Sequence, residues 1–194
     1  IKIDTTPLHS KLKSLLKSTV QGQIRASAWD RISRRMPYVE PGYRVFPKPS
    51  LWLLVDVSGS VSENELSSIM SALREMLESR TLGKAYIVPF DTEATGWFEI
   101  TTPEDLKNIK IEGGGGTYLK PALEKVVKNL KWSDITAVAT DSALSDDLSE
   151  LSEQLKDAVR KTSHPVIWLH FGNESDLDEI IKYSGQHIIP AVID

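Results

Sequence analysis

Cysteine is absent from the 194 residues, and long hydrophobic runs are absent as well. Without cysteine the chain has no disulfide, thiolate zinc site, iron–sulfur cluster or cysteine nucleophile, which agrees with a reducing, cytoplasmic location. The apolar stretches are four to seven residues long and end in charges, Gly or Pro, so none is long enough to cross a membrane. Histidine is scarce, and His9, His164 and His187 have no metal-ligand spacing between them. We therefore expect a protein of the cytoplasm without membrane contact.

Charge divides the chain into two parts. Residues 1–50 carry 10 Lys and Arg against 3 Asp and Glu, whereas the remainder carries 13 against 24, which together give the net charge of −4. We predict an N-terminal region over residues 1–49 and one folded domain over residues 50–194. A basic segment can contact nucleic acid, but these basic residues lack interleaved aromatics, so we expect them to cover the flank of the acidic domain. The chain begins at Ile1 and not at Met, and we interpret it as part of a longer or processed protein.

Near-continuous apolar runs follow residue 50, as is typical of strands buried on both faces. The runs lie at 51–57, 84–90, 134–140, 165–171 and 187–193. The segment 97–100 follows the second run after only six residues, which is too short for a crossover helix, so we expect an antiparallel strand at a sheet edge. Pro190 removes a donor from the last run and favours an edge position there too.

Helical periodicity separates these runs. Apolar residues recur at intervals of three and four around 66–77, 119–130, 148–159 and 177–181. This alternation predicts an α/β fold: a doubly wound, mostly parallel six-stranded sheet with one antiparallel edge strand and helices on both faces. In the N-terminal region, the apolar stripe of Leu8, Leu12, Leu15, Leu16 and Val20 predicts a helix, and the proline-rich stretch from Trp29 onward predicts an extended arm.

Three oxygen-rich loops follow the predicted strands. They contain Asp56, Ser58 and Ser60 in the first, Thr117 after four glycines in the second, and Asp141 in the third. Ligands of open parallel sheets bind at the carboxyl ends of the strands, so we expect these loops to converge. Two carboxylates and three hydroxyls suit Mg²⁺, with Mn²⁺ or Ca²⁺ as alternatives, and a shell with few charged ligands leaves a position for an outside oxygen.

Other readings of these loops fit less well. The glycine run lacks the Lys-Ser/Thr of a phosphate-binding P-loop. A phosphatase of the haloacid dehalogenase type would need an acid/base Asp at the position of Ser58. Metal-dependent phosphoryl transfer therefore fits less well than metal-dependent binding, and it is the alternative function. No Gly-x-Ser-x-Gly elbow is present for a serine hydrolase, and His170 is predicted to be a core histidine. Nucleic-acid contact through the basic arm is a further alternative.

The three loops together resemble the von Willebrand factor A (VWA) family and its metal-ion-dependent adhesion site (MIDAS). DVSGS at 56–60, GGGGTYLKPAL at 113–123 and ATDSA at 139–143 match the three motifs in order, and the resemblance covers about residues 50–193. It implies a Rossmann-like fold in which Ser58, Ser60 and Thr117 contact the metal, while Asp56 and Asp141 act through water. Tyr118 and Ser142 depart from the family pattern, where Asp and Gly often stand.

The resemblance also implies a function. A VWA domain with this site is a non-enzymatic protein-interaction module in which a partner's Glu or Asp completes the metal shell. The stretch WDRISRRMPYVEPG at 29–42 is similar to the segment preceding the VWA-like domain in prokaryotic proteins whose upstream half resembles zinc metallopeptidases. Relatives of this kind often accompany MoxR-type AAA+ ATPases, which implies such a complex as the partner.

Overall fold

Six strands form the central sheet of the domain in the computed structural model, which describes residues 14, 25–32, 41–45, 48–59, 63–79, 82–91, 96–109, 116–171 and 174–193. The strand order is β5-β4-β3-β6-β7-β8. All neighbouring pairs are parallel except β4 and β5, which are antiparallel. The strands are β3 (Ser50–Asp56), β4 (Lys84–Phe90), β5 (Phe98–Ile100), β6 (Ile135–Thr140), β7 (Val166–Phe171) and β8 (Ile188–Ile193). The predicted mixed sheet with an antiparallel edge strand is confirmed.

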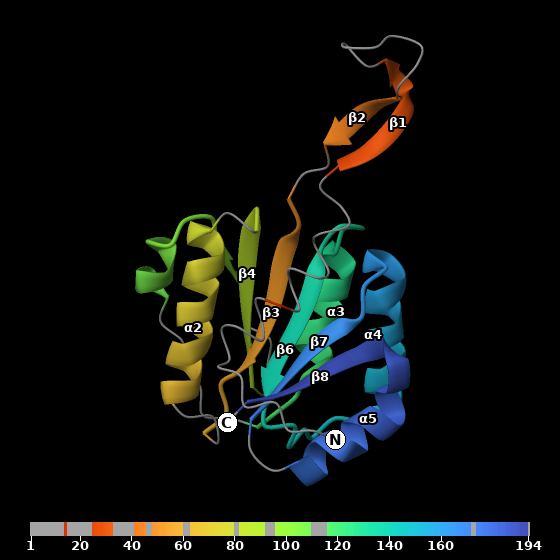
Figure 1. The fold of residues 1–194 in the computed structure, drawn as a ribbon. Coiled ribbons are helices and arrows are strands. Elements are labelled where there is room, and N and C mark those ends of the chain that lie inside the picture. Colours follow the sequence, from red (N-terminus) through yellow and green to blue (C-terminus); the bar gives the residue numbers. More distant parts are fainter. Residues whose placement is uncertain are drawn as a thin grey trace.

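Helices cover both faces of this sheet (Figure 1). Helix α2 (Glu63–Glu78) lies on one face, and α3 (Lys120–Asn129), α4 (Leu148–Thr162) and α5 (Glu174–Ser184) lie on the other. Two short 3₁₀ helices, η1 (Asp105–Asn108) and η2 (Gly185–His187), complete the connections. The chain winds from β3 to β4 in one direction and later from β6 to β8 in the other. The change of direction falls between β3 and β6, where such sheets bind their ligands.

Burial on both faces explains the apolar runs. In β3, Leu51, Leu53 and Val55 pack in the layer beneath α2, while Trp52 and Leu54 pack in the layer beneath α3 and α4. A strand with helices on either side has no polar face, so the alternation expected of a half-exposed strand is absent. Parallel strands in this position depend on their helices for burial, so the hydrophobic core extends through both layers.

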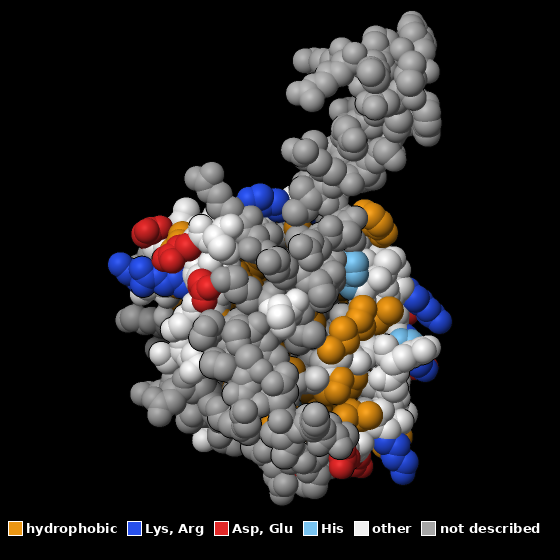
Figure 2. All heavy atoms as spheres, viewed as in Figure 1, with side chains coloured by type: hydrophobic (Ala, Val, Ile, Leu, Met, Phe, Trp, Pro, Cys, Tyr) orange, Lys and Arg blue, Asp and Glu red, His pale blue; other side chains and the backbone are white. Residues whose placement is uncertain are grey.

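The last strand, β8, lies at one edge of the sheet and pairs Pro190 with Trp168 of β7. Pro190 is exposed, as predicted for a residue without a backbone donor at an edge. Figure 2 shows hydrophobic side chains at the surface in the region of β7 and β8, with charged side chains towards the periphery. A proline in an edge strand hinders pairing with another chain, so this edge is protected against further sheet growth.

The N-terminal region contains a feature that its sequence did not predict. Strands β1 (Arg25–Ile32) and β2 (Pro41–Val45) pair with each other in an antiparallel two-stranded sheet. The stretch expected as an extended arm is therefore extended but paired, and Figure 1 shows it projecting beyond the end of the sheet where β3 begins. Of the helix predicted around Leu8–Leu16, only Ser14 lies among the described residues, and it is helical.

Candidate functional site

The first site residue, Asp56, ends β3 at the point where the winding direction changes. Its side chain is completely buried. One carboxylate oxygen accepts a hydrogen bond from the backbone N–H of Ser58 at 2.9 Å, and the other accepts one from the hydroxyl of Thr140 at 2.7 Å. The second bond crosses from β6 to β3, because these strands are neighbours in the sheet. Asp56 is thus fixed between the first and the third of the predicted loops.

Burial raises the pKa of the Asp56 carboxyl above its ordinary value, and the nearby charge of Asp141 acts in the same direction. The hydrogen bonds from Ser58 and Thr140 lower this pKa and offset part of the effect. No cationic side chain of the described residues contributes to the shift. A buried carboxylate beside a second carboxylate, without a basic partner, is an environment in which a bound cation would restore charge balance.

The second loop brings Thr117 to the same end of the sheet. Thr117 is buried, and its carbonyl accepts a hydrogen bond from the backbone N–H of Ser145 at 2.9 Å. The next residue, Tyr118, donates its backbone N–H to the carbonyl of Asp91 at 2.8 Å, and Asp91 directly follows β4. The loop is therefore held from two sides, by the end of β4 and by the third loop. Its glycines before Gly116 lie outside the described residues.

A carboxylate far along the chain fixes the start of α3. Asp146 accepts hydrogen bonds from the backbone N–H groups of Leu119, at 2.5 Å, and Lys120. Burial raises the pKa of Asp146, and these bonds lower it. The cap of the following helix, α4, is Asp147, whose side chain accepts a hydrogen bond from the Ser149 N–H at 2.8 Å. Asp146 instead ties the third loop to the second.

The third loop is supported by a buried network of polar side chains that extends to β7. Ser142 has φ 66°, a left-handed conformation in which glycine is favoured. Its hydroxyl accepts a hydrogen bond from the indole N–H of Trp168 at 3.0 Å and lies 2.8 Å from Nδ1 of His170. His170 is completely buried, which confirms its prediction as a core histidine. Trp168 and His170 therefore hold the backbone next to Asp141 in place.

The structure thus brings four of the five predicted ligands to one end of the sheet. Asp56, Ser58 and Thr117 are buried, and Asp141 is half-buried, with one carboxylate oxygen accepting from the Ala143 N–H at 3.0 Å. Ser60 lies outside the described residues. Among the described residues, no group of three or more His, Asp and Glu side chains is arranged to hold a metal. A cation here would therefore need the hydroxyl oxygens of the motif, which are hard ligands suited to Mg²⁺.

Two further residues contribute to the site although they are not among the predicted metal ligands. Thr140 occupies the last position of the buried strand β6, and Asp146 follows three residues after the motif of the third loop. A hydroxyl at the end of a buried strand is a usable signal, because a buried polar group requires a partner. For Asp146 no local signal exists, since an acidic residue before a helix ordinarily serves that same helix.

In the described part of the chain, no helix is long and apolar enough to cross a bilayer. The tryptophans divide into two classes. Trp52 and Trp168 are buried, whereas Trp132 is 55% exposed. Trp132 lies in the turn between α3 and β6. The helical periodicity of the preceding residues ends with α3, so it does not determine whether Trp132 is buried.

Comparisons with known proteins agree with this architecture. An uncharacterized protein of Thermotoga maritima is 31% identical over 132 residues, which are 66% of this chain but only 32% of that protein. The chain therefore spans about a third of the length of this relative.

Similar solved structures share the fold at low sequence identity. They include the ArnB paralog VWA2 from Sulfolobus acidocaldarius (TM-score 0.56, 14% identity, 79% of this chain and 43% of that chain) and proximal thread matrix protein 1 of the mussel byssus (0.55, 16%, 75% and 44%). The SpRpn10 VWA domain is also similar (TM-score 0.53, 11% identity, 75% of this chain and 87% of that chain). The family model of the VWA-like domain (DUF2201) matches residues 51–176, so the chain belongs to the VWA-like domain family.

Proposed function

We propose that this chain is a non-enzymatic protein-interaction module that binds a divalent cation, with Mg²⁺ as the first choice. VWA-like domains commonly act as interaction modules, and the chain belongs to that family. In this proposal Ser58, Ser60 and Thr117 supply hydroxyl ligands, and Asp56 and Asp141 supply negative charge. The metal would provide a Lewis-acidic position that an outside carboxylate can occupy.

The observation that carries the proposal is the environment of Asp56. A completely buried carboxylate costs free energy unless it is paired, and here its hydrogen bonds from Ser58 and Thr140 compensate only in part. Asp141 adds a second negative charge nearby. Proteins retain such an arrangement where charge serves a function, and a bound cation is the simplest species that would balance it.

The proposed activity is binding and not catalysis. Phosphoryl transfer by an aspartyl nucleophile would require an acid/base group two residues after Asp56, and the hydroxyl of Ser58 has no useful pKa for that role. We expect no turnover of phosphomonoesters. Metal-dependent turnover that Asp56→Asn abolishes would instead establish the enzymatic alternative.

Isothermal titration with Mg²⁺ and Mn²⁺ tests metal binding. We expect the wild-type chain to bind, Asp56→Ala to lose binding, and Thr117→Ala to bind more weakly. Asp105→Ala is the matched control, because it removes a carboxylate that is not part of the predicted site and that accepts hydrogen bonds from the backbone N–H groups of Thr101 and Thr102. Equal binding by all four proteins would refute the proposed site.

The partner is the second half of the proposal. If a carboxylate completes the metal shell, partner binding should require the cation and disappear in EDTA. The sequence resemblance implies a MoxR-type AAA+ ATPase complex as partner, acting in the cytoplasm. Co-purification of this chain with such an ATPase in Mg²⁺, lost with Asp56→Ala but not with Asp105→Ala, is the result that we expect. Co-purification that persists in EDTA would contradict a metal-bridged contact.

A further inference from the structure

A second candidate site lies at the other end of the sheet. A cavity of about 230 Å³ opens beside Ser50, the first residue of β3, whereas Asp56 is the last residue of that strand. At about 3.3 Å per residue, the six intervening steps separate the two by roughly 20 Å. The cavity is smaller than the roughly 300–1,000 Å³ of sites for drug-sized ligands, so its size fits a single side chain.

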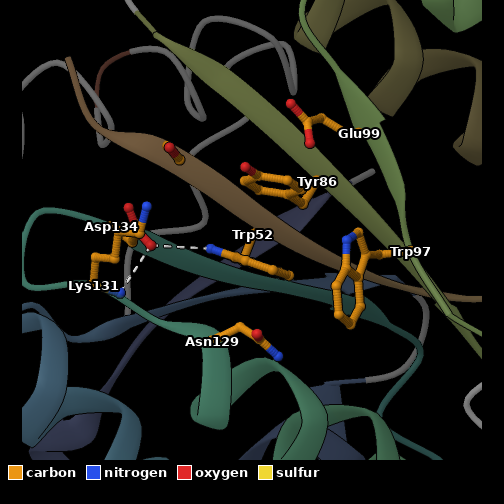
Figure 3. Close-up of a pocket in the computed structure, with 8 residues that line it drawn as sticks. Trp52, Tyr86, Trp97, Glu99, Asn129, Lys131 and Asp134 are labelled. Carbon is orange, nitrogen blue, oxygen red and sulfur yellow. Dashed lines mark hydrogen bonds between the residues drawn. The ribbon is translucent and has the colours of Figure 1, made fainter. Parts of the chain in front are cut away.

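Three aromatic rings form the wall of this cavity (Figure 3). The indole of Trp52 stacks on the ring of Tyr86, with centroids 4.2 Å apart and an interplanar angle of 19°. Trp97 stands nearly perpendicular to Trp52, with centroids 5.5 Å apart and an angle of 72°. Trp52 is buried, but Trp97 is 42% exposed. Two electron-rich ring systems at an angle, one of them open to solvent, form a surface on which a cation is attracted.

Three side chains of the cavity, those of Asp134, Asn129 and Glu99, offer acceptor oxygens. The indole N–H of Trp52 already donates to Oδ2 of Asp134 at 3.1 Å, and the same oxygen accepts from the Lys131 backbone N–H at 2.9 Å. These bonds leave Oδ1 of Asp134 as an acceptor. They also anchor the indole to a carboxylate, which polarises the ring towards greater electron density.

Two further side chains follow the same pattern. Nδ2 of Asn129 donates to the carbonyl of Lys125 at 2.8 Å, which leaves its side-chain oxygen as an acceptor. One carboxylate oxygen of Glu99 pairs with the ammonium of Lys84, and the other oxygen remains. The cavity thus combines acceptor oxygens and aromatic faces, and the complementary ligand is rich in donors, planar or compact, and positively charged.

We propose that this cavity binds the guanidinium group of an arginine side chain presented by a partner protein. A guanidinium is planar, stacks on indole and donates up to five hydrogen bonds, which matches the aromatic faces and the remaining oxygens of Asp134 and Glu99. Among the described residues that line the cavity, Lys131 is the one basic side chain. Lys131 is exposed, so its ammonium group can turn towards solvent when a cation enters the cavity.

N-acetylarginine amide is the probe for this site, and the indole N–H signals in NMR spectra of the full chain are the readout. We expect a saturable shift of the Trp97 and Trp52 signals, with an affinity on the order of millimolar for so small a ligand. N-acetylcitrulline amide has the same shape without the charge and should bind roughly tenfold more weakly. An equal response to citrulline, or tighter binding of methyl glucoside, would overturn the proposal in favour of a neutral ligand.

Variants locate the binding. Trp97→Ala should weaken arginine amide binding roughly tenfold, while Trp132→Ala removes an exposed tryptophan that does not line the cavity and should have no effect. Lys131→Gln should strengthen binding of a cation, and weaker binding in that variant would indicate an anionic ligand instead. The affinity should be the same with Asp56→Ala and in EDTA, so failure of the metal site leaves this test unaffected. Equal affinities for Trp97→Ala and Trp132→Ala would refute the assigned cavity.

Discussion

Thr140 donates a hydrogen bond of 2.7 Å to the carboxylate of Asp56, across 84 positions of sequence. The two residues end neighbouring parallel strands, so their side chains reach the same edge of the sheet. Thr140 also accepts from the backbone N–H of Ser142 at 3.1 Å. One hydroxyl therefore connects the first loop of the site with the third, and it is completely buried.

Removal of this hydroxyl should weaken both the fold and the site. Thr140→Val keeps the shape of the side chain but leaves Asp56 without one of its donors, and we expect the free energy of unfolding to fall by about 1–3 kcal/mol. Mg²⁺ binding should weaken as well, because the carboxylate becomes harder to ionise. Urea denaturation and titration calorimetry measure the two effects.

Thr136 provides the matched control in the same strand. Its hydroxyl is buried and has no hydrogen-bond partner among the residues that the structure describes, so Thr136→Val should leave stability unchanged or raise it by about 1 kcal/mol. Mg²⁺ affinity should not change. If both valine variants lose stability equally, the bond between Thr140 and Asp56 has no special role.

The raised pKa of Asp56 predicts an unusual pH dependence for the metal-free chain. Because folding raises this pKa, the folded state binds the proton more tightly than the unfolded state does. The contribution of Asp56 to stability is therefore favourable below the unfolded pKa and is lost as the pH rises through the folded value. Mg²⁺ requires the ionised form, so its affinity should fall on acidification at a higher pH than for an ordinary Asp.

Chemical denaturation without metal, compared between wild type and Asp56→Asn across acidic and neutral pH, measures the first effect. The wild type should lose stability relative to the variant as the pH increases. Calorimetry with Mg²⁺ over the same range measures the second effect. A stability difference that grows in favour of the wild type with increasing pH would contradict the assigned direction of the shift.

Asp146 should matter for metal binding although it is not a ligand in the proposed site. Asp146→Ala removes the acceptor for the Leu119 and Lys120 N–H groups at the start of α3, at a cost of about 1–2 kcal/mol in the free energy of unfolding. It also releases the loop that carries Thr117, so Mg²⁺ affinity should fall. Asp147→Ala is the matched control, because Asp147 caps α4 through the backbone N–H of Ser149. Equal Mg²⁺ affinities in the two variants would show that the tie between the loops is unimportant.

Ser142 allows two effects to be separated by substitution. Ser142→Ala leaves the buried Trp168 N–H without an acceptor and keeps the left-handed conformation, so we expect a loss of about 2–3 kcal/mol. Ser142→Gly loses the same bond but relieves the conformational strain, and it should be about 1 kcal/mol more stable than the alanine variant. Thermal or urea unfolding of both proteins measures the difference. An alanine variant at least as stable as the glycine variant would exclude strain at this position.

The fold could be predicted from local patterns, because a strand buried on two faces is a continuous apolar run and an amphipathic helix has apolar residues at intervals of three and four. The apolar run at 51–57 became β3, the short segment after 96 became the edge strand β5, and Pro190 lies in the other edge strand. The pairing of β1 with β2 could not be predicted from the sequence. Neither strand is a continuous apolar run, and no short turn connects the two. A two-stranded sheet has little core, so its sequence needs no strong pattern.

The amino-acid sequence by itself determined the order of strands and helices and the positions of Asp56, Ser58, Ser60, Thr117 and Asp141 after them, because these features depend on neighbours in the chain. Only the tertiary structure decided that Thr140 bonds to Asp56, that Asp146 caps α3 and not its own helix, and that Trp52, Tyr86 and Trp97 share one cavity. Each of these contacts joins residues from different strands or loops. Their distance is fixed by strand order and register, which no local pattern of residues specifies.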